Sequence, residues 1–208
     1  MKILAIQNRM GIGDTIIFLP FIKALYKKYN SPISLLVKEN SKADQYLNKT
    51  NYIDKIIILE RNNKNDRHSG FTGILNLIND LQKHNFDKIF IFNSSFRFNI
   101  IARIAGIKNI YQYPLFKKKN QHVIKTAKNF IKEKLNIEVE NNPKIFINNQ
   151  LIKNSKLSYK MNNEEINILL GVGGSGPTKR VPSKIFINFM RLVTEKHKCK
   201  FFLATGKN

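Results

Sequence analysis

Short runs of Ile, Leu, Val and Phe alternate along the chain with longer segments whose apolar residues recur at helical spacing. The short runs predict buried strands over residues 2–7, 33–37, 55–59, 87–92, 107–111, 165–170 and 199–204. Helical spacing is found over residues 14–29, 41–48, 71–84, 96–105, 121–135 and 182–196. Strands that alternate with helices predict an α/β fold with a doubly wound parallel sheet.

The periodic pattern weakens in the middle of the chain, where Asn, Lys and Ser dominate. This composition predicts an interdomain linker over residues 148–164, after a Rossmann-like N-terminal domain over residues 1–147. A new series of strand, glycine-rich loop, helix and strand occupies residues 165–208 and is typical of the start of a second Rossmann-like domain. Because two strands cannot close a sheet, we expect this second domain to be incomplete in the chain.

The chain is strongly basic, with 36 Lys and Arg against 14 Asp and Glu and a formal net charge of +22. Such a charge favours a polyanionic partner, which can be a nucleic acid, a phosphorylated sugar or an anionic membrane. The lysines are spread along the whole chain, so a compositional habit of the source explains the charge equally well. Nucleic-acid modules carry aromatic residues on a basic sheet face, whereas most Phe residues here fall on predicted buried positions. We therefore expect no nucleic-acid partner.

Features that the sequence lacks indicate the cellular compartment of the protein and whether it holds a metal. No run approaches the ~18 apolar residues of a membrane-spanning helix, and the first strand meets Asn8 and Arg9 without a secretory signal. Cys199 is the only cysteine, which excludes an internal disulfide and favours a reducing, cytoplasmic setting. The four histidines are dispersed without ligand spacing, so no metal site is expected.

The first candidate loop reads Asn-Arg-Met-Gly-Ile-Gly-Asp-Thr over residues 8–15, between a predicted strand and a predicted helix. Ligands of doubly wound sheets bind beyond the carboxyl ends of the strands, where this loop lies. Gly11 and Gly13 allow a ligand to approach the backbone closely. The dinucleotide fingerprint is incomplete, because no third glycine stands at position 16. Asp14 is either a cap of the following helix or a functional acid or base.

The second candidate loop, residues 171–182, also joins a predicted strand to a helix and combines glycines, hydroxyls and cations. Backbone N–H groups and a helix N-terminus can surround an anion, and neighbouring cations supply the charge that a diphosphate requires. This combination favours phosphate binding over a flexible turn with solvated cations. The candidate contacts are Gly173, Gly174, Ser175, Thr178, Lys179 and Arg180.

A polar cluster, Asn-Ser-Ser-Phe-Arg, follows the fourth predicted strand at residues 93–97. In a typical sheet of this kind it lies beside the first loop. Asn93, Ser94 and Arg97 are therefore candidates for contact with a ligand. Alternatively, a serine of the cluster only caps the next helix.

Several short motifs in this order resemble the heptosyltransferases of glycosyltransferase family 9. They are Lys2-Ile3-Leu4, then Gly11-Ile12-Gly13-Asp14 with Pro20, the cluster at 93–97, Ala105-Gly106-Ile107, and the segment 177–182, which is similar to the family's Lys-x-Trp-Pro element. The resemblance covers nearly the whole chain. It implies a GT-B architecture, in which two Rossmann-like domains face a cleft, with the acceptor on the N-terminal domain and the nucleotide sugar mostly on the C-terminal one.

The resemblance also implies an activity. It implies transfer, with inversion, of a heptose or a related sugar from an ADP-sugar to a lipopolysaccharide core acceptor on lipid A. Asp14 falls on the family's catalytic base and Lys179 on the cation that meets the donor phosphates. The ADP-sugar is then a co-substrate, and neither a cofactor nor a metal is required. A cytoplasmic protein with peripheral contact at the inner face of the inner membrane fits this activity.

The chain departs from the family pattern in two places. Val181 stands where the family usually has Trp, and the later Asp-Thr-Gly and His element of the donor pocket has no counterpart. The alternative function is a non-catalytic, basic Rossmann-like module that binds anionic saccharide or nucleic acid. Asp14 has no role under that alternative.

Overall fold

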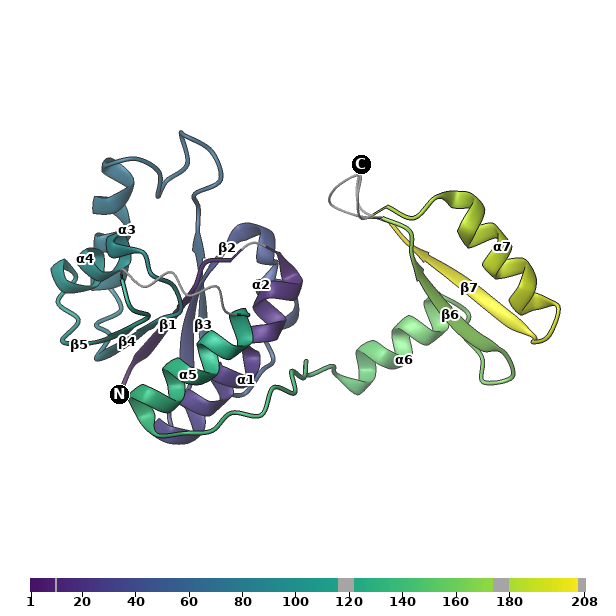
Figure 1. Cartoon of the computed structure of the whole chain (residues 1–208), viewed down its shortest axis with the longest axis horizontal. Coiled ribbons are helices and arrows are strands. Elements are labelled where there is room, and N and C mark those ends of the chain that lie inside the picture. Colours follow the sequence, from purple (N-terminus) through teal and green to yellow (C-terminus); the bar gives the residue numbers. More distant parts are fainter. Residues whose placement is uncertain (10, 116–121, 174–179, 206–208) are drawn as a thin grey trace. The chain divides into compact units, whose positions relative to one another are not determined.

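The computed structural model describes residues 1–9, 11–115, 122–173 and 180–205. The chain divides into two compact units, Met1–Phe146 and Ile147–Asn208. Both units are built from parallel strands and helices, which are labelled in Figure 1.

The first unit is built around a five-stranded sheet in the order β3-β2-β1-β4-β5. Every strand pair is parallel. The strands are β1 (Ile3–Gln7), β2 (Ile33–Lys38), β3 (Ile53–Leu59), β4 (Lys88–Ile91) and β5 (Asn109–Gln112). The predicted α/β fold with a doubly wound parallel sheet is thus confirmed.

Helices cover both faces of this sheet (Figure 1). One face carries α1 (Ile12–Tyr29) and α5 (Val123–Leu135), with the short η1 (Glu39–Ser41) and α2 (Ala43–Tyr46) beside α1. The other face carries α3 (Thr72–Gln82) and α4 (Phe96–Ile104). Side chains alternate across a strand, so Ile3 and Ala5 of β1 pack in the first layer and Leu4 and Ile6 in the second. Both faces of β1 are therefore buried, as its unbroken apolar run predicts.

The second unit contains a two-stranded parallel sheet formed by β6 (Ile166–Gly171) and β7 (Cys199–Ala204). Its helices are α6 (Asn149–Ser158) and α7 (Ser183–Thr194). Phe189 of α7 packs edge-on against Phe201, and Tyr159, directly after α6, packs edge-on against Phe202. Successive residues of β7 thus contact the two helices on opposite faces of the strand.

The segment predicted to be an interdomain linker, residues 148–164, contains helix α6. Asn148 caps this helix, with its side-chain oxygen accepting a hydrogen bond from the Gln150 N–H at 2.8 Å. None of the residues of α6 is buried, which is why the apolar pattern did not predict it. A capping residue was the signal available in the sequence.

Candidate functional site

The first loop and the polar cluster at 93–97 lie together at the carboxyl edge of the first unit's sheet. They follow β1 and β4, which are adjacent strands, and the Phe92 N–H donates to the Ile6 carbonyl at 3.0 Å. The chain continues from β1 to β2 and β3 on one side and resumes at β4 and β5 on the other. This edge is therefore the topological switch point, where ligands of such sheets bind.

Asp14 lies in the first turn of α1 but does not cap it. The N-cap residue is Gly11, which has a φ of 99° and forms no side-chain capping bond. The Asp14 side chain, which is 33% exposed, accepts a hydrogen bond from Arg9 Nε to Oδ1 at 3.2 Å. Among the described residues, Asp14 Oδ2 accepts no hydrogen bond. Asp14 is therefore not the N-cap residue of α1, and its Oδ2 has no hydrogen-bond partner in the described part of the chain.

Gln7, the last residue of β1, braces this loop from inside the fold. Its side chain is only 2% exposed. Gln7 Nε2 donates to the Asp14 carbonyl at 3.2 Å, and Gln7 Oε1 accepts from the Arg9 N–H at 3.0 Å. The sequence pattern did not single out Gln7, although a polar side chain at the end of a buried strand indicates a residue that hydrogen-bonds to the following loop.

The two glycines of the first loop differ in what they do. Gly11 has a positive φ, which only glycine adopts without strain. Gly13 has ordinary backbone geometry, and the space where a Cβ would stand is open. Gly11 therefore shapes the loop, while Gly13 leaves room beside Asp14 in the first turn of α1.

The polar cluster after β4 is held by side-chain amides rather than by a serine cap. Ser95 occupies the N-cap position of α4 but forms no side-chain capping bond. Instead, Asn93 Oδ1 accepts from the Ser95 N–H at 2.8 Å, and Gln112 Nε2 donates to the carbonyls of Asn93 at 3.2 Å and Ser95 at 2.9 Å. Ser94 is exposed. A serine thus stands at the N-cap position without a side-chain capping bond, and Gln112 at the end of β5 is a further residue that the sequence did not indicate.

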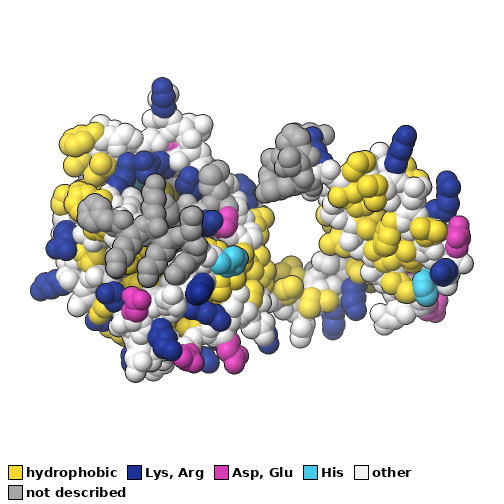
Figure 2. Space-filling view, viewed as in Figure 1, with side chains coloured by type: hydrophobic (Ala, Val, Ile, Leu, Met, Phe, Trp, Pro, Cys, Tyr) yellow, Lys and Arg dark blue, Asp and Glu magenta, His cyan; other side chains and the backbone are white. Residues whose placement is uncertain are grey.

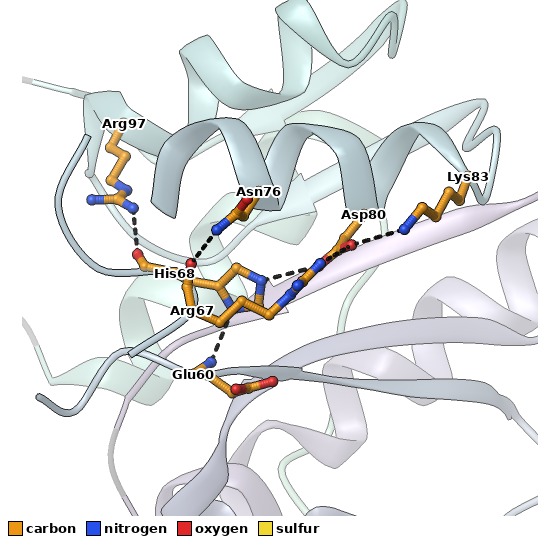
Figure 3. Close-up of polar contacts among 7 residues, drawn as sticks. All are labelled: Glu60, Arg67, His68, Asn76, Asp80, Lys83 and Arg97. Carbon is orange, nitrogen blue, oxygen red and sulfur yellow. Dashed lines mark hydrogen bonds and ion pairs between the residues drawn. The ribbon is translucent and has the colours of Figure 1, made fainter. Parts of the chain in front are cut away.

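Arg97, in the first turn of α4, carries a positive charge beside this cluster. Its Nη2 donates to the His68 carbonyl at 2.7 Å (Figure 3). Burial and, after it, the charge of Arg61 lower the pKa of the Arg97 guanidinium. Two cationic groups thus lie near each other, and no carboxylate pairs with Arg97 in the described part of the chain. Such a pair can hold an anionic group of a ligand.

The second loop is described only at its ends. Gly173 and Arg180 are exposed, while Gly174, Ser175, Thr178 and Lys179 lie outside the described residues. The Val172 N–H donates to the Ala204 carbonyl at 3.2 Å, so the loop leaves the sheet at the carboxyl end of β6. Val181, where the family usually has Trp, is exposed.

A separate groove of about 940 Å³ lies elsewhere on the first unit and does not include Asp14 or the 93–97 cluster. Lys23, Lys27, Lys28 and Lys144 line it. Figure 2 shows that Lys and Arg are otherwise dispersed over the drawn face rather than gathered into one stripe.

Among the described residues, no helix is long and apolar enough to cross a membrane. The same residues contain no group of three or more His, Cys, Asp or Glu suited to a metal ion.

Several solved structures have a fold similar to that of this chain. A glycosyl transferase family 9 protein from Veillonella parvula matches with a TM-score of 0.72 at 20% identity, over 100% of this chain and 70% of the other. Escherichia coli ADP-heptose lipopolysaccharide heptosyltransferase II matches with a TM-score of 0.70 at 16% identity, over 98% of this chain and 64% of the other. The E. coli heptosyltransferase WaaC with ADP matches with a TM-score of 0.62 at 12% identity, over 100% and 69%.

No protein-family model matches the chain, and a search of curated proteins finds no match. The structural likeness shows the fold: the chain has the GT-B type fold of these glycosyltransferases. The resemblance found in the sequence motifs and the fold of the whole chain thus agree.

Proposed function

We propose that the chain belongs to glycosyltransferase family 9 and transfers a heptose or a related sugar from an ADP-sugar to a lipopolysaccharide core acceptor. The observation that carries this proposal is Asp14, whose carboxylate lies at the switch point of a GT-B type fold and does not cap its helix. One of its oxygens is oriented by Arg9 and the other is available. Solved structures with this fold include a heptosyltransferase with ADP and with ADP-2-deoxy-2-fluoro heptose.

In the proposed reaction Asp14 is the general base. The acceptor hydroxyl donates its proton to Asp14 while its oxygen attacks the anomeric carbon, and the bond to the diphosphate breaks on the opposite face. A single displacement of this kind inverts the anomeric configuration. Arg9 keeps the carboxylate in place through Oδ1, so that Oδ2 can receive the proton. Position and hydrogen bonding of the base are thus supplied by residues of one loop.

The donor diphosphate is assigned to the second loop. Gly173, Gly174, Ser175, Thr178 and Lys179 are the proposed contacts. Backbone N–H groups and the Lys179 ammonium would stabilise the negative charge that develops on the departing ADP. No metal ion takes part in this proposal, because the lysine and the loop amides supply the positive potential.

Asn93, Ser94 and Arg97 are assigned to the acceptor. They lie at the same carboxyl edge as Asp14, after the neighbouring strand. The guanidinium groups of Arg97 and Arg61 suit an anionic group of a phosphorylated or acidic saccharide. The first unit is then the acceptor-side domain, and the second unit carries the donor-binding loop.

Lys179→Ala should weaken ADP binding by about tenfold or more, since a hydrogen bond to a charged group contributes ~1.5–3 kcal/mol. Turnover should fall as well, because the leaving diphosphate loses the same contact. Isothermal titration with ADP measures the first effect. Lys196→Ala, an exposed lysine just beyond the other end of α7, is the matched control. Unchanged ADP affinity in Lys179→Ala would remove this lysine from the donor site.

We also propose that the protein is cytoplasmic and contacts the inner face of the inner membrane peripherally. The net charge of +22 and the lysine-lined groove supply the attraction to anionic lipid. Binding to vesicles of anionic phospholipid should weaken markedly with salt, because exposed charges are screened over ~10 Å at 0.1 M ionic strength. Co-sedimentation at rising salt checks this, with neutral vesicles as the control. Salt-insensitive binding, or no binding at low salt, would contradict it.

A further inference from the structure

His68 is a buried histidine that the proposed reaction leaves without a role. It lies in the loop between β3 and α3, and its side chain is 2% exposed. Both ring nitrogens are engaged: Nδ1 accepts from the Glu60 N–H at 3.0 Å, and Nε2 lies 3.1 Å from Asp80 Oδ2 (Figure 3). Because Nδ1 accepts a backbone N–H, the ring proton is on Nε2 and is donated to Asp80. The imidazole therefore connects the end of β3 to the last turn of α3.

Asp80 is itself fixed, so it anchors the imidazole firmly. Arg67 forms a two-pronged ion pair with it, at 2.7 Å from Nη2 to Oδ1 and 3.1 Å from Nε to Oδ2. The hydrogen bonds from Arg67 and then from His68 and Lys83 hold the pKa of the Asp80 carboxyl well below its usual range. A carboxylate that is charged and bound in this way keeps accepting the His68 proton at neutral pH.

The backbone of His68 is packed as tightly as its side chain. Its N–H donates to the Glu60 carbonyl at 2.9 Å. At Gly73, in the first turn of α3, a Cβ would stand 2.2 Å from the His68 carbonyl carbon, so only glycine allows this approach. The His68 peptide is thus held between a strand end and a helix.

The carbonyl of this same peptide binds Arg97. Arg97 Nη2 donates to it at 2.7 Å, while Arg97 Nε is buried without a hydrogen-bond partner among the described residues. A carbonyl orients the guanidinium without neutralising it, whereas a carboxylate would cancel its charge. The full positive charge of Arg97 remains for an anion.

We propose that His68 is a positioning residue: clamped between Glu60 and Asp80, it fixes its own carbonyl so that the Arg97 guanidinium is held in place to receive an anionic group of the acceptor. This inference rests on the proposed acceptor role of Arg97. The buried His68 side chain then determines how strongly Arg97 binds the anionic group, although His68 itself does not contact that group. The anionic group is a phosphate or a carboxylate, which guanidinium groups bind alike.

The test is a titration of the full chain with inorganic phosphate, with acetate in a parallel arm to separate the two anions. The Arg97 Nε–H resonance is the reporter, because this buried group has slow solvent exchange. We expect phosphate or acetate to shift this resonance in the unmodified protein. His68→Ala should lose the shift and weaken anion binding by about tenfold, in line with the loss of one charge-assisted contact.

His68→Asn distinguishes the proposed role from a general folding defect. The side-chain oxygen of the asparagine can still accept the Glu60 N–H, but its NH2 group cannot reach Asp80. An affinity between those of the unmodified protein and His68→Ala supports the clamp. His84→Ala removes another histidine of this unit, one that lies against Phe86, and should leave anion binding unchanged.

Wild-type anion affinity in both His68 variants, with the same anion-induced shift of the Arg97 signal as in the unmodified protein, would overturn the proposal. Normal anion binding by Arg97→Ala would overturn it as well. Neither result depends on sugar transfer, so the assignment of Asp14 as the base is decided separately by turnover.

Discussion

Asp14→Asn should lower the turnover rate of sugar transfer by about 10²–10⁴-fold, which is the usual contribution of a general base. Asparagine has the size of aspartate, and its amide oxygen can still accept the Arg9 Nε hydrogen bond. It cannot take the proton of the acceptor hydroxyl. The helix should be little affected, because Gly11 and not Asp14 is the N-cap residue. The rate of ADP release from an ADP-sugar in the presence of acceptor measures the effect.

Donor affinity should stay near normal in Asp14→Asn, because the proposed diphosphate contacts lie in the second unit. Asp44→Asn is the matched control, since Asp44 is also a carboxylate in the first turn of a helix and lies away from the first loop in the sequence. It should leave turnover unchanged. Near-normal turnover in Asp14→Asn, or a loss that follows only from unfolding, would favour the non-catalytic binding module.

Phe90→Ala should destabilise the first unit by about 3–5 kcal/mol, the usual cost of removing a fully buried aromatic ring. Phe90 is 0% exposed in β4. Its ring stacks on Tyr111 with centroids 4.6 Å apart and contacts Tyr29 and Phe130 at 5.9 and 6.5 Å. These partners come from β5, α1 and α5, so the cavity left by the ring would open at the centre of one helix layer.

Urea unfolding followed by tyrosine fluorescence measures this loss. Six of the seven tyrosines lie within residues 1–146, so the signal reports mainly on the first unit. Phe71→Ala is the control, because Phe71 is 76% exposed and should change the stability by less than about 0.5 kcal/mol. A loss below about 1 kcal/mol in Phe90→Ala would contradict the packing described for β4.

The fold was largely predictable because its central strands, β1, β2 and β4, are buried on both faces. An unbroken apolar run such as Ile3–Gln7 has no other stable placement in a chain of this composition. Gly106 follows the end of α4 with a φ of 84°, the left-handed conformation that glycine commonly adopts after a helix. The sequence pattern does not predict helix α6, because the helix buries no side chain and no recurring apolar positions indicate it.

The candidate site was predictable in place but not in detail. Asp14 and the 93–97 cluster follow strands, and topology alone brings them to one edge. Which side chains hold them depends on contacts between distant residues, such as Gln112 with Asn93 or Arg97 with His68. The sequence does not indicate a role for His68, because its buried position and its hydrogen bonds to Glu60 and Asp80 arise from the fold.

The most direct test of the account is incubation of the full chain with ADP-heptose and a deacylated lipopolysaccharide core acceptor. Released ADP and the mass of the acceptor are measured together, and the anomeric configuration of the product is read by NMR. The account predicts one ADP for each acceptor that gains one heptose, with the configuration inverted relative to the donor. Binding of ADP-heptose without release of ADP in the presence of acceptor, or a product with retained configuration, would contradict it.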